Sequence, residues 1–433
     1  MKLRSVVAAS AAALALVACA TQEDTTDTDG TWVGTITTEG NITTVVNESG
    51  SVWGGTARLV EEASIGVETG DDAYMFGQVR AVSGTDDHIY VVDGQVKLVR
   101  RYDADGVFID NIGRIGQGPG EYTEPSMIEV APDGRIFVWD RVLRRVVVFG
   151  PDGTPLETWP ANGAYCCVYP IFFDAVGGAN GGALWMLTYA VNRETGEEVF
   201  HLRAFGPDGP FGPSHELPEF DGASRGIHVV NGQRMTIPFA HLFLGSTAGP
   251  ARFLFADPNT YRFEVRERSE TVRIVEKHWE PVPVDPEHAE WQRKATVADV
   301  RRRNPGWNWD GAGMPEHQRA YSAFYAAASG EVWVLRNAPS VPASECVEDP
   351  LADADTWAST PFGRRSCWRN AYAVDVFDAG GRFLGEVDTP AGAFSYPYSL
   401  AHHIDGDRVV AAIEDEAGTI MVKRYRLVLP GEQ

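Results

Sequence analysis

The stretch from Pro132 to Gly153, PDGRIFVWDRVLRRVVVFGPDG, limits the possible folds of this chain more than any other feature. It places two apolar runs between two copies of Pro-Asp-Gly. Because nearly every position in both runs is apolar or β-branched, we predict two strands whose two faces are both covered by protein. The Asp-Gly pairs supply the positive φ angles of tight hairpin turns. Such a sheet has to lie between other sheets.

The same unit occurs again earlier in the chain. Gly134 and Gly153 are 19 residues apart, and the turns at Asp87 and Gly106 have the same spacing. With one strand added before and one after, each unit becomes a four-stranded antiparallel meander. A meander of this kind is one blade of a β-propeller.

Four more units follow. The third and fourth cover about 165–218 and 224–279, and the fourth allows more than one strand assignment. In the fifth, Gly330 and Gly381 are 51 residues apart instead of 19, which leaves an insertion of 32 residues. The sixth begins near Ser395 and ends after three strands.

The incomplete sixth unit needs one more strand to cover its edge. The segment Thr56–Gly66 alternates as a strand does and has no partner of its own, so it can supply the missing outer strand. We therefore predict an all-β chain. Residues 56–433 form a single six-bladed β-propeller of four-stranded antiparallel blades, closed by this N-terminal strand.

The N-terminus indicates export and a lipid anchor. Lys2 and Arg4 precede an apolar stretch that is too short to span a membrane, which is typical of a secretory signal. Leu-Val-Ala-Cys at its end matches a bacterial lipobox, which makes Cys19 the predicted lipidation site; a plain signal peptide cut elsewhere is the alternative. We assign 1–19 to the signal, and 20–55 to a polar tether and peripheral segment.

Export places the other four cysteines in an oxidising compartment. We predict a disulfide between Cys346 and Cys367, which would stabilise the insertion by about 3 kcal/mol. Cys166 and Cys167 either form a vicinal disulfide or remain two buried thiols. No histidine pattern accompanies them, so we expect no metal there.

One segment carries a family resemblance. From Gly113 to Gly153 a Gly-rich loop, a strand ending in aromatic-Asp and an Arg-bearing third strand follow one another. This order resembles the NHL-like and TolB-like six-bladed propellers of exported bacterial proteins. The resemblance implies the fold, but not an activity, because these families include binding scaffolds, lactone hydrolases and lyases. No position here matches a catalytic motif of these families.

The longer loops share one face of the predicted ring, and binding usually resides in such loops. They include the insertion and a crossing from Pro281 to about Arg319, in which Asp285-Pro286 and Asn304-Pro305 bracket a helix between blades four and five. The helix could be a lid or could only fill the gap between blades. The candidate ligand residues on or near this face are Arg141, Arg144, Arg336, Trp307, Trp309 and His402.

Each candidate has a structural alternative. The arginines would suit an anionic ligand, but arginine in a propeller also ties blades together. The tryptophans could stack on a ligand ring or anchor their loop. His402-His403, His228 and His241 lie in or near inner strands, and adjacent histidines in a strand point to opposite faces, so they do not chelate one ion together.

The formal net charge of -23 would repel phosphate backbones, so we exclude nucleic acid as a partner. We found no phosphate-binding loop, nucleophile elbow or HExxH motif. We therefore predict a monomeric, non-enzymatic scaffold in the bacterial cell envelope, on the outer membrane. It would need no cofactor and would bind an unidentified protein, peptide or small ligand. The alternative is a hydrolase or lyase that uses a divalent cation in the central channel.

Overall fold

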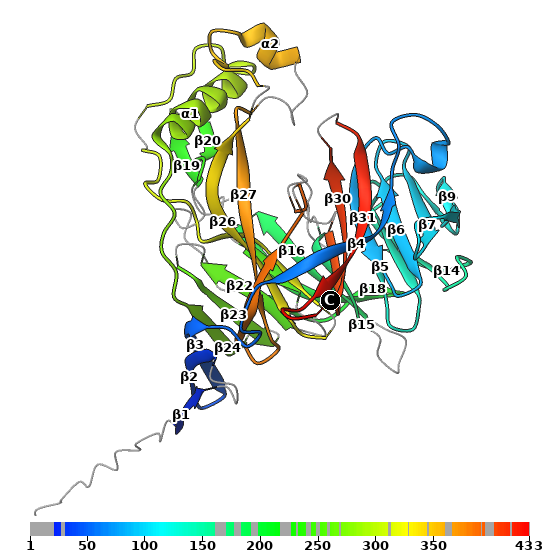
Figure 1. Cartoon of the computed structure of the whole chain (residues 1–433). Coiled ribbons are helices and arrows are strands. Elements are labelled where there is room, and N and C mark those ends of the chain that lie inside the picture. The colour runs from blue at the N-terminus through cyan, green and yellow to red at the C-terminus, as the bar shows by residue number, and fades with distance from the viewer. Residues whose placement is uncertain are drawn as a thin grey trace, which may run out of the picture.

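The structure is built from antiparallel sheets of four consecutive strands (Figure 1). The computed structural model describes residues 21–26, 31–160, 170–176, 183–191, 198–216, 227–230, 233–239, 244–247, 252–257, 260–267, 270–310, 313–327, 329–343, 346–359, 366–390, 392–394, 402–415 and 418–432. Blade 1 consists of β5 (Val79–Gly84), β6 (His88–Asp93), β7 (Leu98–Asp103) and β8 (Phe108–Asn111), and blade 2 of β11 (Pro125–Val130), β12 (Ile136–Asp140), β13 (Arg145–Phe149) and β14 (Pro155–Pro160). Blade 3 consists of β15 (Pro170–Val176), β16 (Ala183–Val191), β17 (Glu198–Gly206) and β18 (Gly209–Glu216), and blade 4 of β21 (Leu244–Thr247), β22 (Arg252–Asp257), β23 (Arg262–Glu267) and β24 (Glu270–Lys277). Blade 5 consists of β25 (Tyr321–Ala326), β26 (Val332–Pro342), β27 (Trp368–Phe377) and β28 (Phe383–Asp388).

Blade 6 combines strands from both ends of the chain. The C-terminal part contributes β29 (His402–Asp405), β30 (Arg408–Glu414) and β31 (Ile420–Val428). The outer edge of β31 pairs antiparallel with β4 (Ala57–Ile65). The innermost strand of each blade contacts the innermost strand of the next, in the cycle β5, β11, β15, β21, β25, β29 and back to β5. The chain is thus a six-bladed β-propeller.

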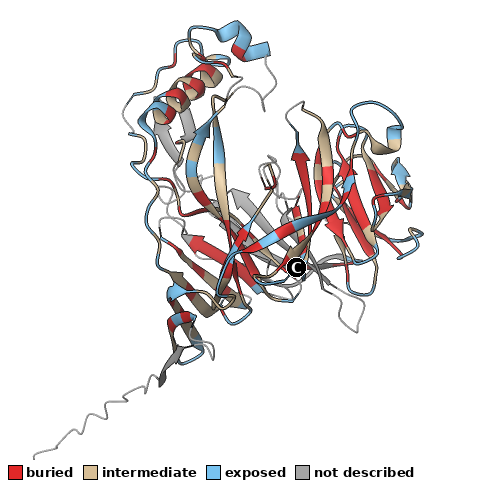
Figure 2. Cartoon of the chain, viewed as in Figure 1, coloured by how far each residue is buried: buried red, intermediate tan, exposed pale blue. Residues whose placement is uncertain are grey.

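Burial on both faces of the inner strands, in the blades whose side chains are described, explains why the sheets stack around a ring (Figure 2). All five residues of β12 are buried, as the sequence predicted. Phe137 and Trp139 face one apolar cluster, whereas Ile136 and Val138 face another that includes side chains of blade 1. Each blade therefore needs a neighbour on both sides.

The Asp-Gly turns adopt the predicted conformation. Gly134 and Gly153 both have a φ of 84°. At the first of these turns, Asp133 Oδ1 accepts a hydrogen bond from the backbone N–H of Arg135 at 3.1 Å. Glycine at the turn avoids the steric cost of a left-handed backbone, and aspartate satisfies the next amide.

The segment before blade 1 is more ordered than predicted. Residues 31–65, which we call the strap, run across the outer edges of blades 4, 5 and 6. β2 (Trp32–Glu39) and β3 (Ile42–Gly50) form a hairpin, and β3 pairs parallel with β24. After two backbone bonds to β28, the strap continues into β4.

Thr21–Thr26, which we predicted as part of a tether, forms β1 and pairs with β2. Our argument was that an acidic segment without large apolar residues cannot pack. An edge strand is held by backbone hydrogen bonds, so its pairing does not require apolar side chains.

The irregular fourth unit also differs from the prediction. The segment QRMT, which we had grouped with the strands of blade 4, forms β20 (Gln233–Thr236) and pairs with β19 (Ile227–Val230) in a separate hairpin. The inner strand of blade 4 is β21 instead. Several apolar runs of similar length compete for this place, and local pattern does not choose between them. Other short elements are η1 (Asp72–Tyr74), β9 (Arg114–Ile115) and β10 (Glu121–Tyr122).

Arginines fasten neighbouring blades at the face opposite the long loops. Arg101 of blade 1 donates to the carbonyl oxygens of Pro151 at 2.7 Å and Asp152 at 3.3 Å in blade 2. Arg424 of blade 6 donates to the carbonyl oxygen of Asp86 in blade 1 at 3.0 Å. A guanidinium has several donors in one plane, so it can satisfy the carbonyls of a turn without a carboxylate.

The long-loop face carries an addition, which we call the cap (residues 285–310, 346–359 and 366–368). It contains α1 (Pro286–Arg301), in the crossing between blades 4 and 5, and α2 (Ala354–Ser359), in the insertion between β26 and β27. Asp285 caps α1 by accepting from the N–H of Glu287 at 2.8 Å and of His288 at 3.1 Å. An aspartate before a first-turn proline is a strong helix start.

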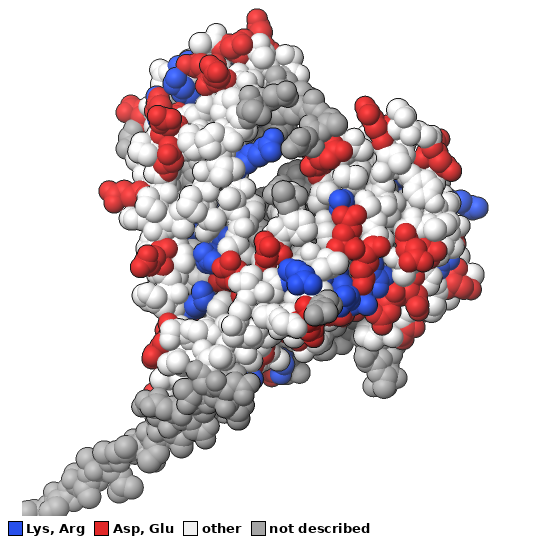
Figure 3. Space-filling view, viewed as in Figure 1, with Lys and Arg blue, Asp and Glu red and all other residues white. Residues whose placement is uncertain are grey.

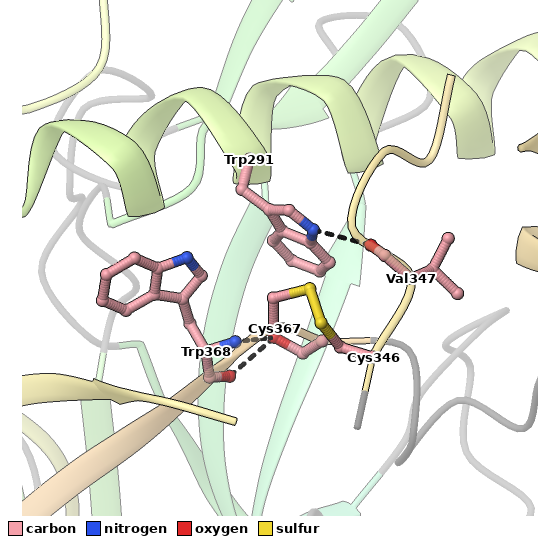
Figure 4. Close-up of a disulfide and its surroundings, with 6 residues drawn as sticks. Trp291, Cys346, Val347, Cys367 and Trp368 are labelled. Carbon is pink, nitrogen blue, oxygen red and sulfur yellow. Dashed lines mark hydrogen bonds between the residues drawn. A yellow bond between two sulfur atoms is a disulfide. The ribbon is translucent and has the colours of Figure 1, made fainter. Parts of the chain in front are cut away.

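A disulfide between Cys346 and Cys367 closes the insertion beneath α1 (Figure 4). Trp291 of α1 points toward it and donates from Nε1 to the carbonyl oxygen of Val347 at 3.0 Å. Trp357 of α2 donates to Asp299 at 2.9 Å. The helix and the insertion therefore share one apolar core and form a single unit.

Asn47 connects three parts of the propeller. Its Oδ1 accepts from Trp32 Nε1 at 2.8 Å and from the N–H of Phe383 at 2.7 Å. Its Nδ2 donates to the carbonyl oxygens of Glu276 at 3.0 Å and Gly381 at 3.1 Å. The buried side-chain amide of Asn47 thus joins the strap to blades 4 and 5, and it accepts two hydrogen bonds and donates two.

We expect Asn47→Ala to lower the free energy of unfolding by about 3 kcal/mol, because several buried donors and acceptors lose their partners. Urea unfolding followed by tryptophan fluorescence measures this. Asn41→Ala, at an exposed turn of the same hairpin, is the matched control and should change stability by less than about 0.5 kcal/mol. Equal effects of the two substitutions would contradict the role assigned to Asn47.

Candidate functional site

A β-bulge recurs where the innermost strands begin. The pairing register shifts between Val79 and Ala81, between Pro125 and Met127, and at the corresponding places in β15 and β25. Each shift leaves one residue of the inner strand without a cross-strand partner. This residue is Arg80 in blade 1, Ser126 in blade 2 and Ser322 in blade 5. Because the inner strands begin where the crossings arrive, these residues lie on the cap face, and bulges often redirect side chains at functional sites.

Arg319 lies at this end of the channel, two residues before β25. Its Nη2 donates to Ser322 Oγ at 3.1 Å, and its backbone carbonyl accepts from Asn337 Nδ2 at 2.8 Å. Burial lowers the pKa of Arg319, although its side chain remains partly exposed. Within the described residues it forms no ion pair. In the part of the chain that the structure describes, Arg319 is therefore a partly desolvated guanidinium without a carboxylate partner.

Blade 5 also carries two tyrosines. Tyr372, on β27, is the cross-strand partner of Asn337, whose amide donates to the Arg319 carbonyl oxygen. Burial raises the pKa of Tyr325, on β25, above its ordinary value. Tyr325 Oη is 3.3 Å from His402 Nδ1. Arg319, Tyr372, Tyr325 and His402 are polar residues of blades 5 and 6 in this region, and we call them the polar row.

Phe394 holds the far end of the polar row. Its ring stacks on His402 with centroids 5.1 Å apart, and it lies 5.8 Å from Tyr325. Its φ is 61°, in the left-handed region that an aromatic residue rarely adopts. Such a conformation persists only where the surroundings enforce it, and it is common at binding sites.

The three predicted arginines do not meet in one site. Arg336 contacts Asp375 at 3.2 Å and Glu386 at 2.8 Å, so it ties three strands of blade 5. Asp375 is fully buried and also accepts from Tyr261 Oη at 2.6 Å. A buried carboxylate needs such partners, which makes Arg336 a structural residue.

Arg141 pairs with Glu124, which also contacts Arg80 at 2.9 Å. Arg141 is the main cause of the lowered pKa of Glu124. Arg144 is exposed and has a φ of 49° in the turn between β12 and β13. Of the three predicted arginines, Arg141 lies near another arginine, Arg80, and the two cations share the carboxylate of Glu124.

The two tryptophans belong to the cap. Trp307 is 3% exposed and packs on Val297 of α1. Trp309 lies edge-on to it, with ring centroids 6.4 Å apart. These contacts fit the anchoring alternative, since Trp307 has almost no surface left for a ligand.

Other predicted residues lie elsewhere or are not described. Burial lowers the pKa of His403, which follows His402 in β29. In the described part of the chain, no group of three or more His, Cys, Asp or Glu side chains is arranged to hold a metal ion. Cys19, Cys166, Cys167 and His241 lie outside the described residues, as does the side chain of His228.

Sequence reasoning missed the two residues nearest the start of the polar row. Arg319 is the last arginine of the long crossing and immediately precedes an inner strand, which was the available signal. Tyr372 gave no signal, because it reaches the site only through the pairing of β27 with β26.

Comparisons with known proteins agree on the fold. Residues 38–171 match a family model described as a 6-bladed beta-propeller. No functionally curated protein matches the chain.

Among solved structures, a DUF4221 family member from Bacteroides vulgatus has 10% identity and a TM-score of 0.47, with 86% of this chain and 99% of that one covered. A Bacteroides fragilis protein described as exported has 11% identity and a TM-score of 0.41, with 85% and 94% covered. Virginiamycin B lyase from Staphylococcus aureus has 9% identity and a TM-score of 0.39, with 86% and 99% covered. Likeness of this degree carries no argument about function.

The surface is hollowed between the cap and the tip of β30 and β31 (Figure 3). Acidic side chains are spread over the visible face, in keeping with the net charge of -23. Arg319 is one of the arginines that form no ion pair among the described residues, and its pKa is lowered by burial. The cap-side end of the channel, with the polar row, is therefore the candidate binding site.

The cap itself contains a titratable group. His288 of α1 is 1% exposed, and its ring stacks on Trp368 at 4.8 Å and meets the edge of Phe239 at 4.7 Å. Its Nε2 is 3.3 Å from Gln292 Nε2, and its Nδ1 has no hydrogen-bond partner among the described residues. Burial lowers the pKa of His288 to about 4, against the weaker opposite effect of Asp285.

We expect the cap to lose stability as the pH falls from 6.5 to about 4. His288 is neutral in the folded cap and becomes protonated in the unfolded chain below pH 6.5, so protons favour unfolding in this window. The loss levels off below pH 4 at about 3 kcal/mol. Thermal unfolding monitored by tryptophan fluorescence across this pH range measures it. His288→Gln should flatten the profile, whereas His317→Gln, at an exposed position, should preserve it.

Proposed function

We propose that this protein is a non-enzymatic binding protein of the bacterial cell envelope, and that it binds an anionic ligand at the cap-side end of the propeller channel. The observation that carries the proposal is Arg319, a partly desolvated guanidinium without an ion pair in the described chain. A bound anion would supply the missing counter-charge.

Arg336, Arg101 and Arg141 each contact at least one carboxylate. Arg144, Arg145 and Arg273, like Arg319, form no ion pair among the described residues. Removing a cation from water costs free energy that a paired carboxylate offsets. Arg319 has no carboxylate partner within the described fold, so a bound anion would lower this cost.

The geometry of the guanidinium suits an oxyanion. Among the described residues, only its Nη2 donates a hydrogen bond, to Ser322. The remaining N–H groups lie in one plane and can donate two parallel bonds to a carboxylate, phosphate or sulfate. The acidic protein as a whole repels anions, so affinity has to come from this short-range contact rather than from long-range attraction.

The anchor proposed at Cys19 agrees with this arrangement. β1 begins at Thr21 and lies at the end of the molecule opposite α1 and α2 (Figure 1). A lipid attached just before β1 would hold that end at the membrane and leave the cap face open to solvent. Among the described residues, no helix has the length and apolar character needed to cross a bilayer.

We expect Arg319→Gln to weaken binding of a carboxylate or sulfate by about 10- to 100-fold, the effect of losing a charge-assisted hydrogen bond. Isothermal titration of the purified full-length protein with citrate, acetate and sulfate measures the affinities. Arg144→Gln, which removes an exposed arginine, is the matched control and should bind as the wild type does. Unchanged anion binding in the Arg319 variant would refute the proposed site.

We expect Cys19→Ala to move the protein from the membrane fraction to the soluble fraction, because acylation would be its only attachment. Fractionation with immunodetection, together with metabolic labelling by a radioactive fatty acid, measures this. Cys346→Ala, which removes a cysteine of the cap, should leave both readouts unchanged. If the Cys19→Ala variant stayed in the membrane fraction, acylation of Cys19 would not be what holds the protein at the membrane.

A further inference from the structure

Blade 5 differs from blades 1 and 2 at the residues around Arg319. In all three blades, the carbonyl oxygen of the residue just before the first strand accepts a backbone hydrogen bond from the second-strand side. The donor and acceptor pairs are Gly94 and Gln78 at 2.7 Å, Arg141 and Glu124 at 3.2 Å, and Asn337 and Ala320 at 3.0 Å. This shared bond aligns the three blades, so that their side chains can be compared position by position.

Blades 1 and 2 have a buried aspartate where blade 5 has Arg336. Each aspartate pairs with the first residue of the inner strand, as Arg336 does with Tyr321. It also accepts a hydrogen bond from the backbone N–H at the position that Arg319 occupies in blade 5. These bonds run from Gly77 to Asp93 at 3.4 Å and from Thr123 to Asp140 at 2.7 Å. Blade 5 therefore has an arginine, already paired with Asp375, where the other two blades place a carboxylate beside this position.

Arg319 is held by a closed ring of three hydrogen bonds. Its Nη2 donates to Ser322 Oγ at 3.1 Å, and Ser322 donates to Asn337 Oδ1 at 2.6 Å. Asn337 Nδ2 then donates to the carbonyl oxygen of Arg319 at 2.8 Å. Asn337 is 6% exposed, so a buried amide connects the guanidinium to the backbone of the same arginine.

The fold itself does not require an asparagine at position 337. Gly94 and Arg141 make the same backbone hydrogen bond in blades 1 and 2, and glycine has no side chain. The side-chain amide of Asn337 bonds to Arg319 and to Ser322, the residue that holds the guanidinium. The ring therefore acts on the guanidinium rather than on the pairing of the strands.

We propose that Ser322 and Asn337 are positioning residues of the anion site, and that they leave one edge of Arg319 for a single carboxylate. This inference rests on the proposed function. A guanidinium has two edges with paired donors, one formed by Nη2 and Nε and the other by Nη2 and Nη1. Ser322 takes one N–H of Nη2, so the edge that uses the other N–H keeps both donors. That edge matches the two oxygens of a carboxylate, and the ring fixes its orientation before the ligand arrives.

The first test opens the ring at Ser322. Ser322→Ala should weaken acetate binding by the full-length protein about 3- to 10-fold, because the ligand then has to order the guanidinium. Ser322→Thr keeps the hydroxyl and should bind within about twofold of the wild type. Ser126→Ala, at the same bulge position of blade 2, is the matched control and should bind as the wild type does. Acetate titration followed by NMR of isotope-labelled arginine side chains measures these affinities.

The same spectra separate positioning from folding. The Nη protons of Arg319 are identified by their absence from the spectrum of Arg319→Gln. They should exchange with water more slowly in the wild type and in Ser322→Thr than in Ser322→Ala, because a hydrogen bond to Nη2 is lost only in the alanine variant. Urea unfolding shows that each variant is folded under the conditions of the titration.

The second test changes the charge at position 337. Asn337→Asp places a carboxylate beside Arg319, as blades 1 and 2 do at the neighbouring position, so it should compete with the ligand and weaken acetate binding at least about tenfold. Asn337→Gly introduces the residue of blade 1 and opens the ring without adding a charge. Its effect should stay at about 3- to 10-fold, as for Ser322→Ala.

The outcomes distinguish the two levels of the proposal. If Arg319→Gln weakens acetate binding while Ser322→Ala and Asn337→Asp bind as the wild type does, the positioning inference is wrong and the anion site stands. Equal losses in Ser322→Thr and Ser322→Ala would also overturn the inference, because the hydroxyl would then not be what holds the guanidinium. If Arg319→Gln affects no anion, the anion site itself fails.

Discussion

The fold depends on blades that are apolar on both faces. β12 is buried at every position, and alternate residues such as Phe137 and Val138 enter different apolar clusters. A sheet of this kind cannot end at solvent, so each blade has to pack between two others. A closed cycle satisfies this for every blade, because it leaves no terminal sheet. The contacts between successive inner strands, from β5 around to β29 and back, are the consequence.

Closure moves the problem of exposed edges to the outer strands. The strap covers three of these edges, with β3 on β24, two backbone bonds to β28, and β4 on β31. Asn47 joins them at the point where blades 4 and 5 meet. Glu62 of β4 lies among Arg408 at 3.1 Å, Arg424 at 3.3 Å and Arg426 at 3.4 Å, so the strap also supplies the counter-charge for blade 6.

Local pattern predicted what depends on local chemistry. The turns at Gly134 and Gly153, the strands of blade 2 and the place of the large insertion all follow from residue types close in sequence. The pairing of β3 with β24 did not, because a threonine-rich strand with a partner more than 200 residues away leaves no periodic signal. The sequence also did not predict which arginines would pair with a carboxylate. Whether a guanidinium meets a carboxylate depends on the pairing register, which gives Arg336 a partner in Asp375 and gives Arg319 none among the described residues.

The same side chain thus has two uses in one ring. On the face opposite the cap, Arg101 and Arg424 are satisfied by turns of the next blade, and this pairing fixes blade geometry. On the cap face, Arg319 and Tyr372 lie just beyond the two segments that form the cap, the α1 crossing and the disulfide-closed insertion. The shared core and the disulfide hold these two segments together. If the proposed site binds an anion, this preorganised cap would reduce the entropy lost when the ligand orders the site.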